Sequence, residues 1–281
     1  MVPFGVRLRT AMDAHGPFCA GIDPHRGLVE GWGLPYDFAG VERFALTCVE
    51  AFGGVVAAVK PQSAFFEVFG SRGVALLERV LDELRSAGTL TILDAKRGDI
   101  GTTMDAYADA FLGKDSPSPA DALTVSPYLG YGSLRPAIDL AAATGRGVFV
   151  LALTSNPEGP SVQHAVRDGR SVAGQIVDGA AADNAEAADL GHVGLVVGAT
   201  VGTAVTDLQI DLAAAKAPLL APGLGAQGAT AEDLQTVFGA ALPNVLANSS
   251  RGILSAGPDA GALRAAAVRE SGTLSDVLGG A

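Results

Sequence analysis

The sequence predicts a single (β/α)8 barrel. Eight short apolar runs are rich in Val, Leu and Ala and show little polar alternation; they cover residues 17–23, 54–60, 90–96, 122–127, 147–154, 193–199, 218–223 and 244–250. Strands that are buried on both faces, as in a parallel sheet, have this pattern. Amphipathic stretches separate the runs, and a length of 281 residues suits one α/β barrel.

Two of the intervening stretches show helical spacing. In residues 37–52 and 72–88, apolar side chains recur at intervals of three or four positions. The first set is Val41, Phe44, Ala45, Cys48, Val49 and Phe52, and the second is Val74, Leu77, Val80, Leu81 and Leu84. Gly88 predicts the end of the second helix. Thr230, with Asp233 three positions later, predicts the start of another.

A doubly wound open sheet is the alternative fold. It is less favoured because the first run, residues 17–23, is not followed by a GxGxxG loop. The longest connection covers residues 155–190 and predicts a helical insertion after the fifth strand. Because the chain shows neither an internal repeat nor a low-complexity linker, we expect one domain over residues 1–281.

Composition excludes several classes of function. The net charge of -11 argues against a nucleic-acid surface, which needs a basic stripe. The two cysteines, Cys19 and Cys48, form no CxxC pair, and Cys48 falls on the apolar face of its predicted helix. No apolar run is long enough to span a bilayer, and the N-terminal residues lack the apolar core of a signal peptide. We therefore expect a soluble, cytoplasmic protein.

Polar residues stand where several predicted strands end. Asp23, Lys60, Asp94, Lys96 and Ser155 all occupy such positions. The carboxyl ends of barrel strands form the active site in enzymes of this architecture, so these side chains are expected to converge on one mouth. A solvated rim is the alternative interpretation, but it explains several converging charges less well.

The stretch "TILDAKRGDIGTT", residues 91–103, holds the densest group of charges. Side chains two apart on a strand share a face, so Asp94 and Lys96 can both point into the mouth, where Lys60 can join them. Asp99 lies beyond the strand and either folds back over its own site or reaches into a neighbouring subunit. An ordinary salt-bridge cluster is the alternative, although burying such pairs often costs as much free energy as it recovers.

Two loops near the C-terminus suggest a phosphate site. Residues 221–230 ("APGLGAQGAT") follow the seventh run and contain Gln227, and residues 248–254 ("NSSRGIL") follow the eighth and contain Arg251. Barrels commonly bind phosphate at these two positions, and the guanidinium fork suits a phosphate group. Alternatively, the glycines only form turns and Arg251 is a surface residue.

Several motifs, in order, resemble those of orotidine 5′-phosphate decarboxylases. "LDAKRGD" matches the family's Asp-x-Lys-x-x-Asp signature, and "GIDP", "VKPQSAFFE", "LTSNPEG", "APGLGAQG" and "SSRGI" accompany it between Gly21 and Ile253. The chain is most similar to the longer bacterial branch of the family. The signature alone also occurs in related sugar-phosphate barrels, whereas its combination with "LTSNPEG" and "GLGAQG" is specific. The 155–190 connection departs from the short-branch pattern.

The resemblance implies decarboxylation of orotidine 5′-phosphate to uridine 5′-phosphate, the last step of UMP biosynthesis, without metal or cofactor. It implies a homodimer in which Asp99 and Thr103 serve the partner's site. Lys96 would be the proton donor within a charged array. The resemblance assigns Lys60, Asp94, Lys96 and Asp99 to that array, and Asp23, Thr103, Ser155, Pro222, Gln227 and Arg251 to substrate binding.

Two rival functions remain open at this point. A magnesium-dependent sugar-phosphate decarboxylase or aldolase could use the same barrel, and its carboxylates would hold the metal. A catalytically silent nucleotide-binding barrel could bind uridine 5′-phosphate without turnover. The four histidines, at positions 15, 25, 164 and 192, form no ligand pattern and are expected to be surface or locally hydrogen-bonded residues.

Overall fold

The computed structural model describes residues 1–224 and 230–278. Eight parallel strands close into a barrel, in the order β1-β10-β9-β8-β5-β4-β3-β2. The strands are β1 (Phe18–Ile22), β2 (Ala58–Pro61), β3 (Leu90–Arg97), β4 (Ala122–Val125), β5 (Gly147–Leu153), β8 (Val193–Val197), β9 (Leu219–Pro222) and β10 (Val245–Ser249). Each lies on one of the eight predicted runs, so the predicted (β/α)8 barrel is confirmed.

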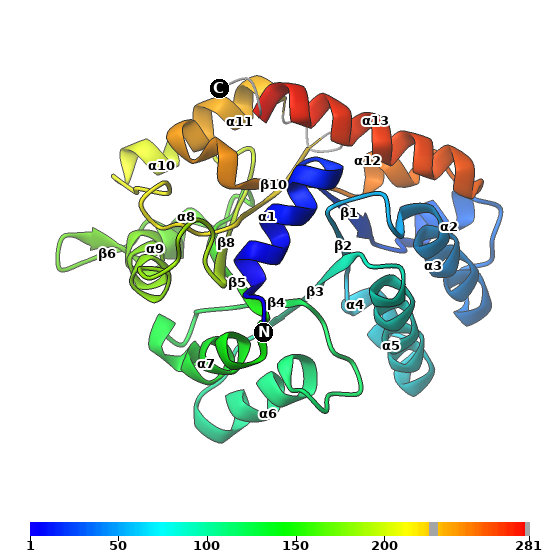
Figure 1. The fold of residues 1–281 in the computed structure, drawn as a ribbon, viewed down its shortest axis with the longest axis horizontal. Coiled ribbons are helices and arrows are strands. Elements are labelled where there is room, and N and C mark those ends of the chain that lie inside the picture. Colours follow the sequence, from blue (N-terminus) through cyan, green and yellow to red (C-terminus); the bar gives the residue numbers. More distant parts are fainter. Residues whose placement is uncertain (225–229, 279–281) are drawn as a thin grey trace.

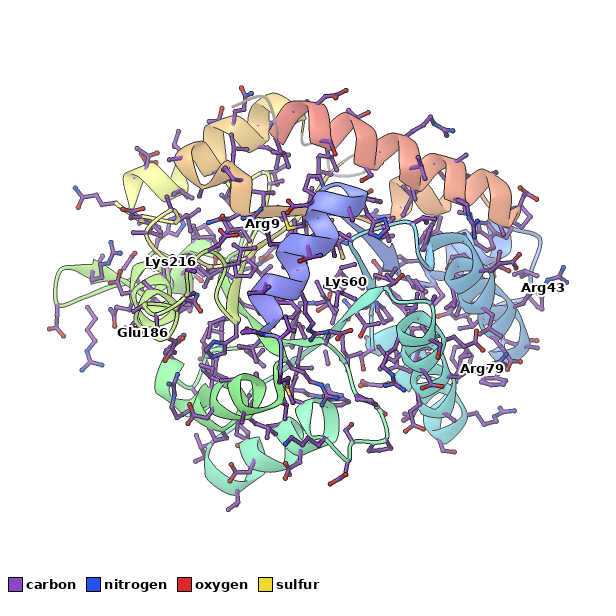
Figure 2. All side chains as sticks on the ribbon, in the orientation of Figure 1. Arg9, Arg43, Lys60, Arg79, Glu186 and Lys216 are labelled. Atoms are coloured by element: carbon purple, nitrogen blue, oxygen red, sulfur yellow. The ribbon has the colours of Figure 1, made fainter. Side chains whose placement is uncertain are left out.

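One helix runs across an end of the barrel, and the other helices lie around the barrel (Figure 1). The helices are α1 (Phe4–His15), α2 (Arg26–Gly31), α3 (Phe38–Phe52), α4 (Ala64–Glu67), α5 (Gly70–Ser86), α6 (Gly101–Leu112), η1 (Tyr131–Leu134), α7 (Arg135–Thr144), α8 (Pro160–Gln163), α9 (Val172–Asp183), α10 (Ala204–Asp207), α11 (Ala231–Phe238), η2 (Gly239–Asn244), α12 (Arg251–Leu254) and α13 (Ala260–Leu278). None of these described helices is long and apolar enough to cross a membrane. Side chains fill the space between helices and strands (Figure 2).

The predicted helix signals are largely confirmed. Asp37 accepts a hydrogen bond from Gly40 N at the start of α3, and Thr230 forms a reciprocal capping box with Asp233 at the start of α11. Gly88 follows α5 with a φ of 77°, a left-handed conformation that glycine adopts without strain. The prediction that Val74 lies on the buried face of α5 was wrong: it is the fifth residue of the helix and is 41% exposed.

Helix α1 closes the N-terminal end of the barrel. It runs across that end in Figure 1. Its side chains Phe4, Leu8 and Met12 pack in one buried cluster with residues of the barrel interior, among them Ile92 and Leu246. Phe4 meets Phe149 edge to face, with ring centroids 6.0 Å apart. The opposite, C-terminal end of the barrel is therefore the end where a ligand can enter.

The connection from residue 155 to 190 contains more than one kind of element. Helix α8 is followed by a two-stranded antiparallel hairpin of β6 (Val166–Arg167) and β7 (Arg170–Ser171). Helix α9 then packs against β5 and β8, and the Ser171 side chain accepts a hydrogen bond from Gly174 N at its start. The short α8 and the hairpin thus precede the helix that covers the barrel.

Candidate active site

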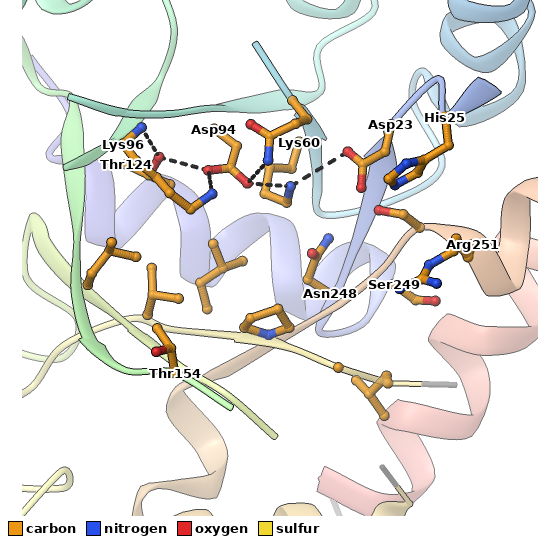
Figure 3. A pocket seen from close by; sticks show the side chains of 18 residues that line it. Asp23, His25, Lys60, Asp94, Lys96, Thr124, Thr154, Asn248, Ser249 and Arg251 are labelled. Carbon is orange, nitrogen blue, oxygen red and sulfur yellow. Dashed lines mark hydrogen bonds and ion pairs between the residues drawn. The ribbon is translucent and has the colours of Figure 1, made fainter. Parts of the chain in front are cut away.

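A cavity of about 280 Å³ opens at the C-terminal ends of the barrel strands. Four of its charged lining residues come from three adjacent strands and their loops: Asp23 follows β1, Lys60 lies on β2, and Asp94 and Lys96 lie on β3. A fifth, Arg251, follows β10. Figure 3 shows the first four side chains along one wall of the cavity, with Thr154 on the opposite side. The expected convergence of strand-end charges is therefore present.

Asp94 is the centre of the charged wall. Its Oδ2 accepts hydrogen bonds from Lys60 Nζ at 2.8 Å and from Gln62 Nε2 at 3.1 Å. Its Oδ1 accepts from Lys96 Nζ at 2.6 Å and from Thr124 Oγ1 at 3.0 Å. A buried carboxylate with two cationic and two neutral donors is fully satisfied and held in one orientation.

The electrostatics of this group keep Asp94 and Lys60 charged. Burial alone would raise the pKa of Asp94, but the ammonium groups of Lys60 and Lys96 outweigh it and hold that pKa well below its usual range. Burial would lower the pKa of Lys60, but the carboxylates of Asp23 and Asp94 reverse the direction and raise it. The site is thus a fixed alternation of negative and positive charge.

The backbone around Lys96 differs from the regular strand expected from the sequence. Lys96 has a φ of 47°, and the pairing of β3 with β4 shifts between Leu93 and Arg97. The amides of Ala95 and Lys96 both donate to Thr124 Oγ1, at 3.0 and 2.9 Å. A left-handed residue in an irregular strand, rather than simple alternation, therefore turns the Lys96 ammonium back to Asp94.

Asp23 has unused acceptor capacity beside this group. Its Oδ1 is buried and has no hydrogen-bond partner among the described residues, and Lys60 Nζ lies 3.8 Å from it. Buried acceptors are normally satisfied, so an orphaned oxygen at a cavity wall marks a place for a donor from a ligand. Hydroxyl groups of a sugar would supply such donors.

Arg251, at the predicted phosphate end, lies near His25 and Asp23 in the mouth (Figure 3). Pro222, Gly223, Ser250 and Arg251 line this end, and Figure 3 shows Arg251 far from Thr154. A Cβ on Gly21 would lie only 1.8 Å from Ser250 Oγ, so this glycine allows the first and last strand ends to approach closely. The predicted residue Gln227 lies outside the described residues.

Three predicted site residues do not join the described lining of this cavity. Thr103 is exposed on α6, and Asp99 lies before that helix with its Oδ1 accepting from Ile100 N at 2.8 Å. Ser155 is exposed just beyond the lining residue Thr154. Within one chain, then, Lys60, Asp94 and Lys96 come together, whereas Asp99 remains apart.

Several polar lining residues were not predicted from the sequence, namely His25, Gln62, Thr124, Thr154 and Asn248. Gln62 and Asn248 stand at strand ends, the signal that identified the charged residues, and could have been found by it. Thr124 is a lone hydroxyl in an apolar run and carries no such signal. His25, which was expected to be a surface or locally hydrogen-bonded residue, is half-buried on the cavity wall against Phe65, with ring centroids 4.3 Å apart.

The described acidic side chains of the site do not form a metal site. In residues 1–224 and 230–278, no group of three or more His, Cys, Asp or Glu side chains is arranged to hold a metal ion. The carboxylates of Asp23 and Asp94 instead face ammonium groups. What the arrangement can do chemically is stabilise a developing negative charge and deliver a proton from Lys96.

Known proteins resemble this chain along almost its whole length. A model of the orotidine 5′-phosphate decarboxylase / HUMPS family matches residues 16–266. An orotidine 5′-phosphate decarboxylase of Streptomyces coelicolor is 62% identical over 271 residues, which is 96% of each chain. One of Salinispora arenicola is 61% identical over 270 residues, again 96% of each chain.

Solved structures show the same similarity in three dimensions. A crystal structure assigned as an orotidine 5′-phosphate decarboxylase of Streptomyces avermitilis has a TM-score of 0.96 at 59% identity, covering 99% of this chain and 97% of that one. The structure of Leishmania donovani OMP decarboxylase has a TM-score of 0.78 at 30% identity, covering 100% of both chains. The barrel, its insertion after β5 and the charged wall are thus set in a fold shared with these proteins.

Proposed function

The chain belongs to the orotidine 5′-phosphate decarboxylase / HUMPS family and its own close relatives are carboxy-lyases, and from this premise we propose a specific reaction. The protein converts orotidine 5′-phosphate into uridine 5′-phosphate and carbon dioxide, the last step of de novo UMP synthesis. It uses neither a metal nor an organic cofactor.

One observation carries the proposal. Asp94 is held between the ammonium groups of Lys60 and Lys96, at 2.8 and 2.6 Å, at the mouth of the barrel. Loss of carbon dioxide from C6 of the pyrimidine leaves an electron pair in the plane of the ring, where little delocalisation helps. A reaction of this kind needs positive charge placed beforehand at the carbon that becomes negative.

Lys96 meets that need. Its ammonium stabilises the carbanion as the C6–carboxylate bond breaks, and the electron pair of that bond then takes a proton from Nζ to form the C6–H bond. The Lys96 side chain is 45% exposed, in contrast to the buried Lys60, so its ammonium is accessible to a ligand in the cavity. The neutral amine regains its proton from solvent after the product leaves.

The neighbouring charges set the conditions for this step. Asp94 lies beside the departing carboxylate and disfavours bound substrate more than the transition state, a form of ground-state destabilisation. Lys60 fixes Asp94 on one side. Asp99 from the partner subunit completes the alternating array and helps to hold Lys96 in place.

The remaining predicted residues bind the substrate away from C6. Asp23 accepts from ribose hydroxyls, Ser155 hydrogen-bonds the pyrimidine, and Thr103 of the partner contacts the ribose. Pro222 ends strand β9 at the mouth rather than lying in a loop, and Gln227 and Arg251 hold the phosphate. Binding energy at the phosphate end is used to organise a dry site around the distant C6.

Dimerisation explains why Asp99 and Thr103 lie outside the cavity of one chain. The loop after β3 and the loop after β4 are in close contact. A Cβ on Gly98 would lie only 2.4 Å from Ser126 O. These loops carry exposed apolar side chains, Ile100 at 63%, Tyr128 at 80% and Leu129 at 53%. Such a surface suits a partner copy that brings Asp99 and Thr103 to the other site.

The proposal is tested by the absorbance change after orotidine 5′-phosphate is added to the purified protein with EDTA present. Conversion to uridine 5′-phosphate under these conditions supports both the reaction and its independence from divalent metal. Inhibition by EDTA would favour a magnesium-dependent sugar-phosphate decarboxylase or aldolase. Binding of uridine 5′-phosphate without any conversion would favour a silent nucleotide-binding barrel.

A further inference from the structure

Thr154 is the polar side chain at the cavity wall opposite Asp94 and Lys60 (Figure 3). It is the first residue after β5 and stands at the end of the mouth away from Arg251. Its aliphatic neighbours in the lining include Leu151 and Val196. Under the proposed function, the phosphate occupies the Arg251 end, so the pyrimidine extends toward Thr154.

The side-chain carboxamide of Gln163 makes two hydrogen bonds to Thr154. Gln163 Oε1 accepts a hydrogen bond from Thr154 N at 2.9 Å, and Gln163 Nε2 donates to Thr154 Oγ1 at 2.7 Å. Thr154 Oγ1 in turn donates to Asn156 Oδ1 at 2.6 Å. The two atoms of the amide thus hold both the backbone and the hydroxyl of one residue, which leaves it a single orientation.

Two glycines in the surrounding backbone leave room for the hydrogen bonds between Gln163 and Thr154. A Cβ on Gly159 would lie 3.0 Å from Thr154 Oγ1 and 3.2 Å from Gln163 Oε1, so a side chain there would press on both partners. A Cβ on Gly198 would lie 3.3 Å from Ser155 N. Two glycines therefore let the loop that begins at Thr154 pack closely against Gln163 and the end of β8.

Gln163 also lies next to a second cavity. It lines this cavity of about 250 Å³ together with Val162 and Ile176, and Leu151 lines both this cavity and the candidate active site. Gln163 lies on α8, in the connection that distinguishes this chain from the shorter pattern. Shortening the Gln163 side chain would therefore remove both hydrogen bonds to Thr154 and enlarge the second cavity.

We infer that Gln163 is a positioning residue for recognition of the pyrimidine base. It acts through Thr154 and the adjoining Ser155, whose polar groups it presents to the base in a fixed geometry. The inference rests on the proposed function, because the cavity must hold a pyrimidine nucleotide. It assigns to the α8 segment a part in selecting the base, separate from phosphate binding and from proton transfer.

The test compares a ligand that has the base with one that lacks it. Dissociation constants for uridine 5′-phosphate and ribose 5-phosphate are measured with the wild-type protein, Gln163→Ala and Gln163→Met. Methionine keeps most of the volume of glutamine and fills the wall, so it separates loss of the hydrogen bonds from loss of packing. Gln175→Ala is the matched control, because Gln175 is exposed on α9 and donates to Arg170 O instead.

The inference predicts a selective loss. Both Gln163 variants should bind uridine 5′-phosphate about fivefold or more weakly, as expected when two part-buried hydrogen bonds are removed, with ribose 5-phosphate binding unchanged. In turnover, KM should rise more than kcat falls. The Gln175 control should match wild type in every measurement.

Two results would overturn the inference. One is unchanged affinity for uridine 5′-phosphate in Gln163→Met. The other is an equal loss for both ligands, which would mean that the whole mouth is disturbed. A wild-type protein that binds uridine 5′-phosphate but does not decarboxylate would instead refute the proposed reaction, while the comparison of the two ligands would still decide the role of Gln163.

Discussion

The ammonium of Lys96 lies 2.6 Å from Asp94 Oδ1, although only Ala95 separates the two residues in the chain. A regular strand would send both side chains outward in parallel. Here the left-handed φ of 47° at Lys96 bends the chain, and Thr124 Oγ1 accepts from both amides of the bend. The backbone conformation therefore fixes the contact between Lys96 and Asp94.

Replacing Lys96 by Ala should abolish turnover without unfolding the protein. Turnover should fall by more than about a thousandfold, because both the charge and the transferable proton are lost. The side chain is 45% exposed, so its removal leaves no large buried void. Turnover and thermal unfolding are measured beside Lys114→Ala, which removes an exposed lysine elsewhere. Near wild-type activity in Lys96→Ala would refute the assignment of Lys96 as proton donor.

Replacing Asp94 by Asn should destabilise the fold, because buried Lys60 then loses its main counter-charge. Breaking one partner of a buried pair costs about 3 kcal/mol of unfolding free energy. Asp13→Asn, at an exposed position on α1, is the control for loss of one negative charge. Urea denaturation at neutral pH measures both variants. Equal stability of Asp94→Asn and wild type would show that the array contributes nothing to folding.

The stability gap between wild type and Asp94→Asn should depend on pH. The folded pKa of Asp94 is lowered from 3.8, so its contribution is fully present above that value and is lost as pH falls below it toward the folded pKa. The folded pKa of Lys60 is raised from 10.5, so its contribution is present below that value and is lost as pH rises through the folded pKa. The difference in unfolding free energy between the two proteins should be constant near neutral pH and should decrease toward both acidic and alkaline pH. An increase of this difference in acid would contradict the charged state of Asp94.

Replacing Arg251 by Ala should chiefly raise KM. A bidentate guanidinium at the phosphate end contributes to binding remote from C6, so we expect KM to rise about tenfold or more. Arg269→Ala, at an exposed position on α13, removes a guanidinium far from the mouth and serves as the control. An unchanged KM in steady-state kinetics would remove Arg251 from the phosphate site.

Two inactive variants should restore activity when they are combined. If Asp99 serves the partner's site, a heterodimer of Lys96→Ala and Asp99→Ala subunits contains one site with both residues intact. Unfolding and refolding an equal mixture should recover about a quarter of wild-type activity, from random pairing of the two kinds of subunit. Each variant refolded alone is the control. Failure to recover activity in mixed dimers would place Asp99 in the site of its own chain.

The sequence was most informative where a residue's role is local. Each barrel strand could be predicted because burial on both faces leaves an unbroken apolar run, and Asp23, Lys60 and Asp94 could be placed at one mouth because parallel strands end together. The bend at Lys96 could not be foreseen, since it depends on Thr124 from the neighbouring strand. The hydrogen bonds between Gln163 and Thr154 could not be predicted either, because the two residues are nine positions apart in an irregular connection.

The helix α1 across the far end of the barrel has a consequence for traffic through the enzyme. Because Phe4, Leu8 and Met12 pack on the filled interior at that end, the described residues leave the site open at the opposite, C-terminal end. Under the proposed reaction, carbon dioxide forms while the nucleotide still occupies this opening. Both products then leave through the same end of the barrel.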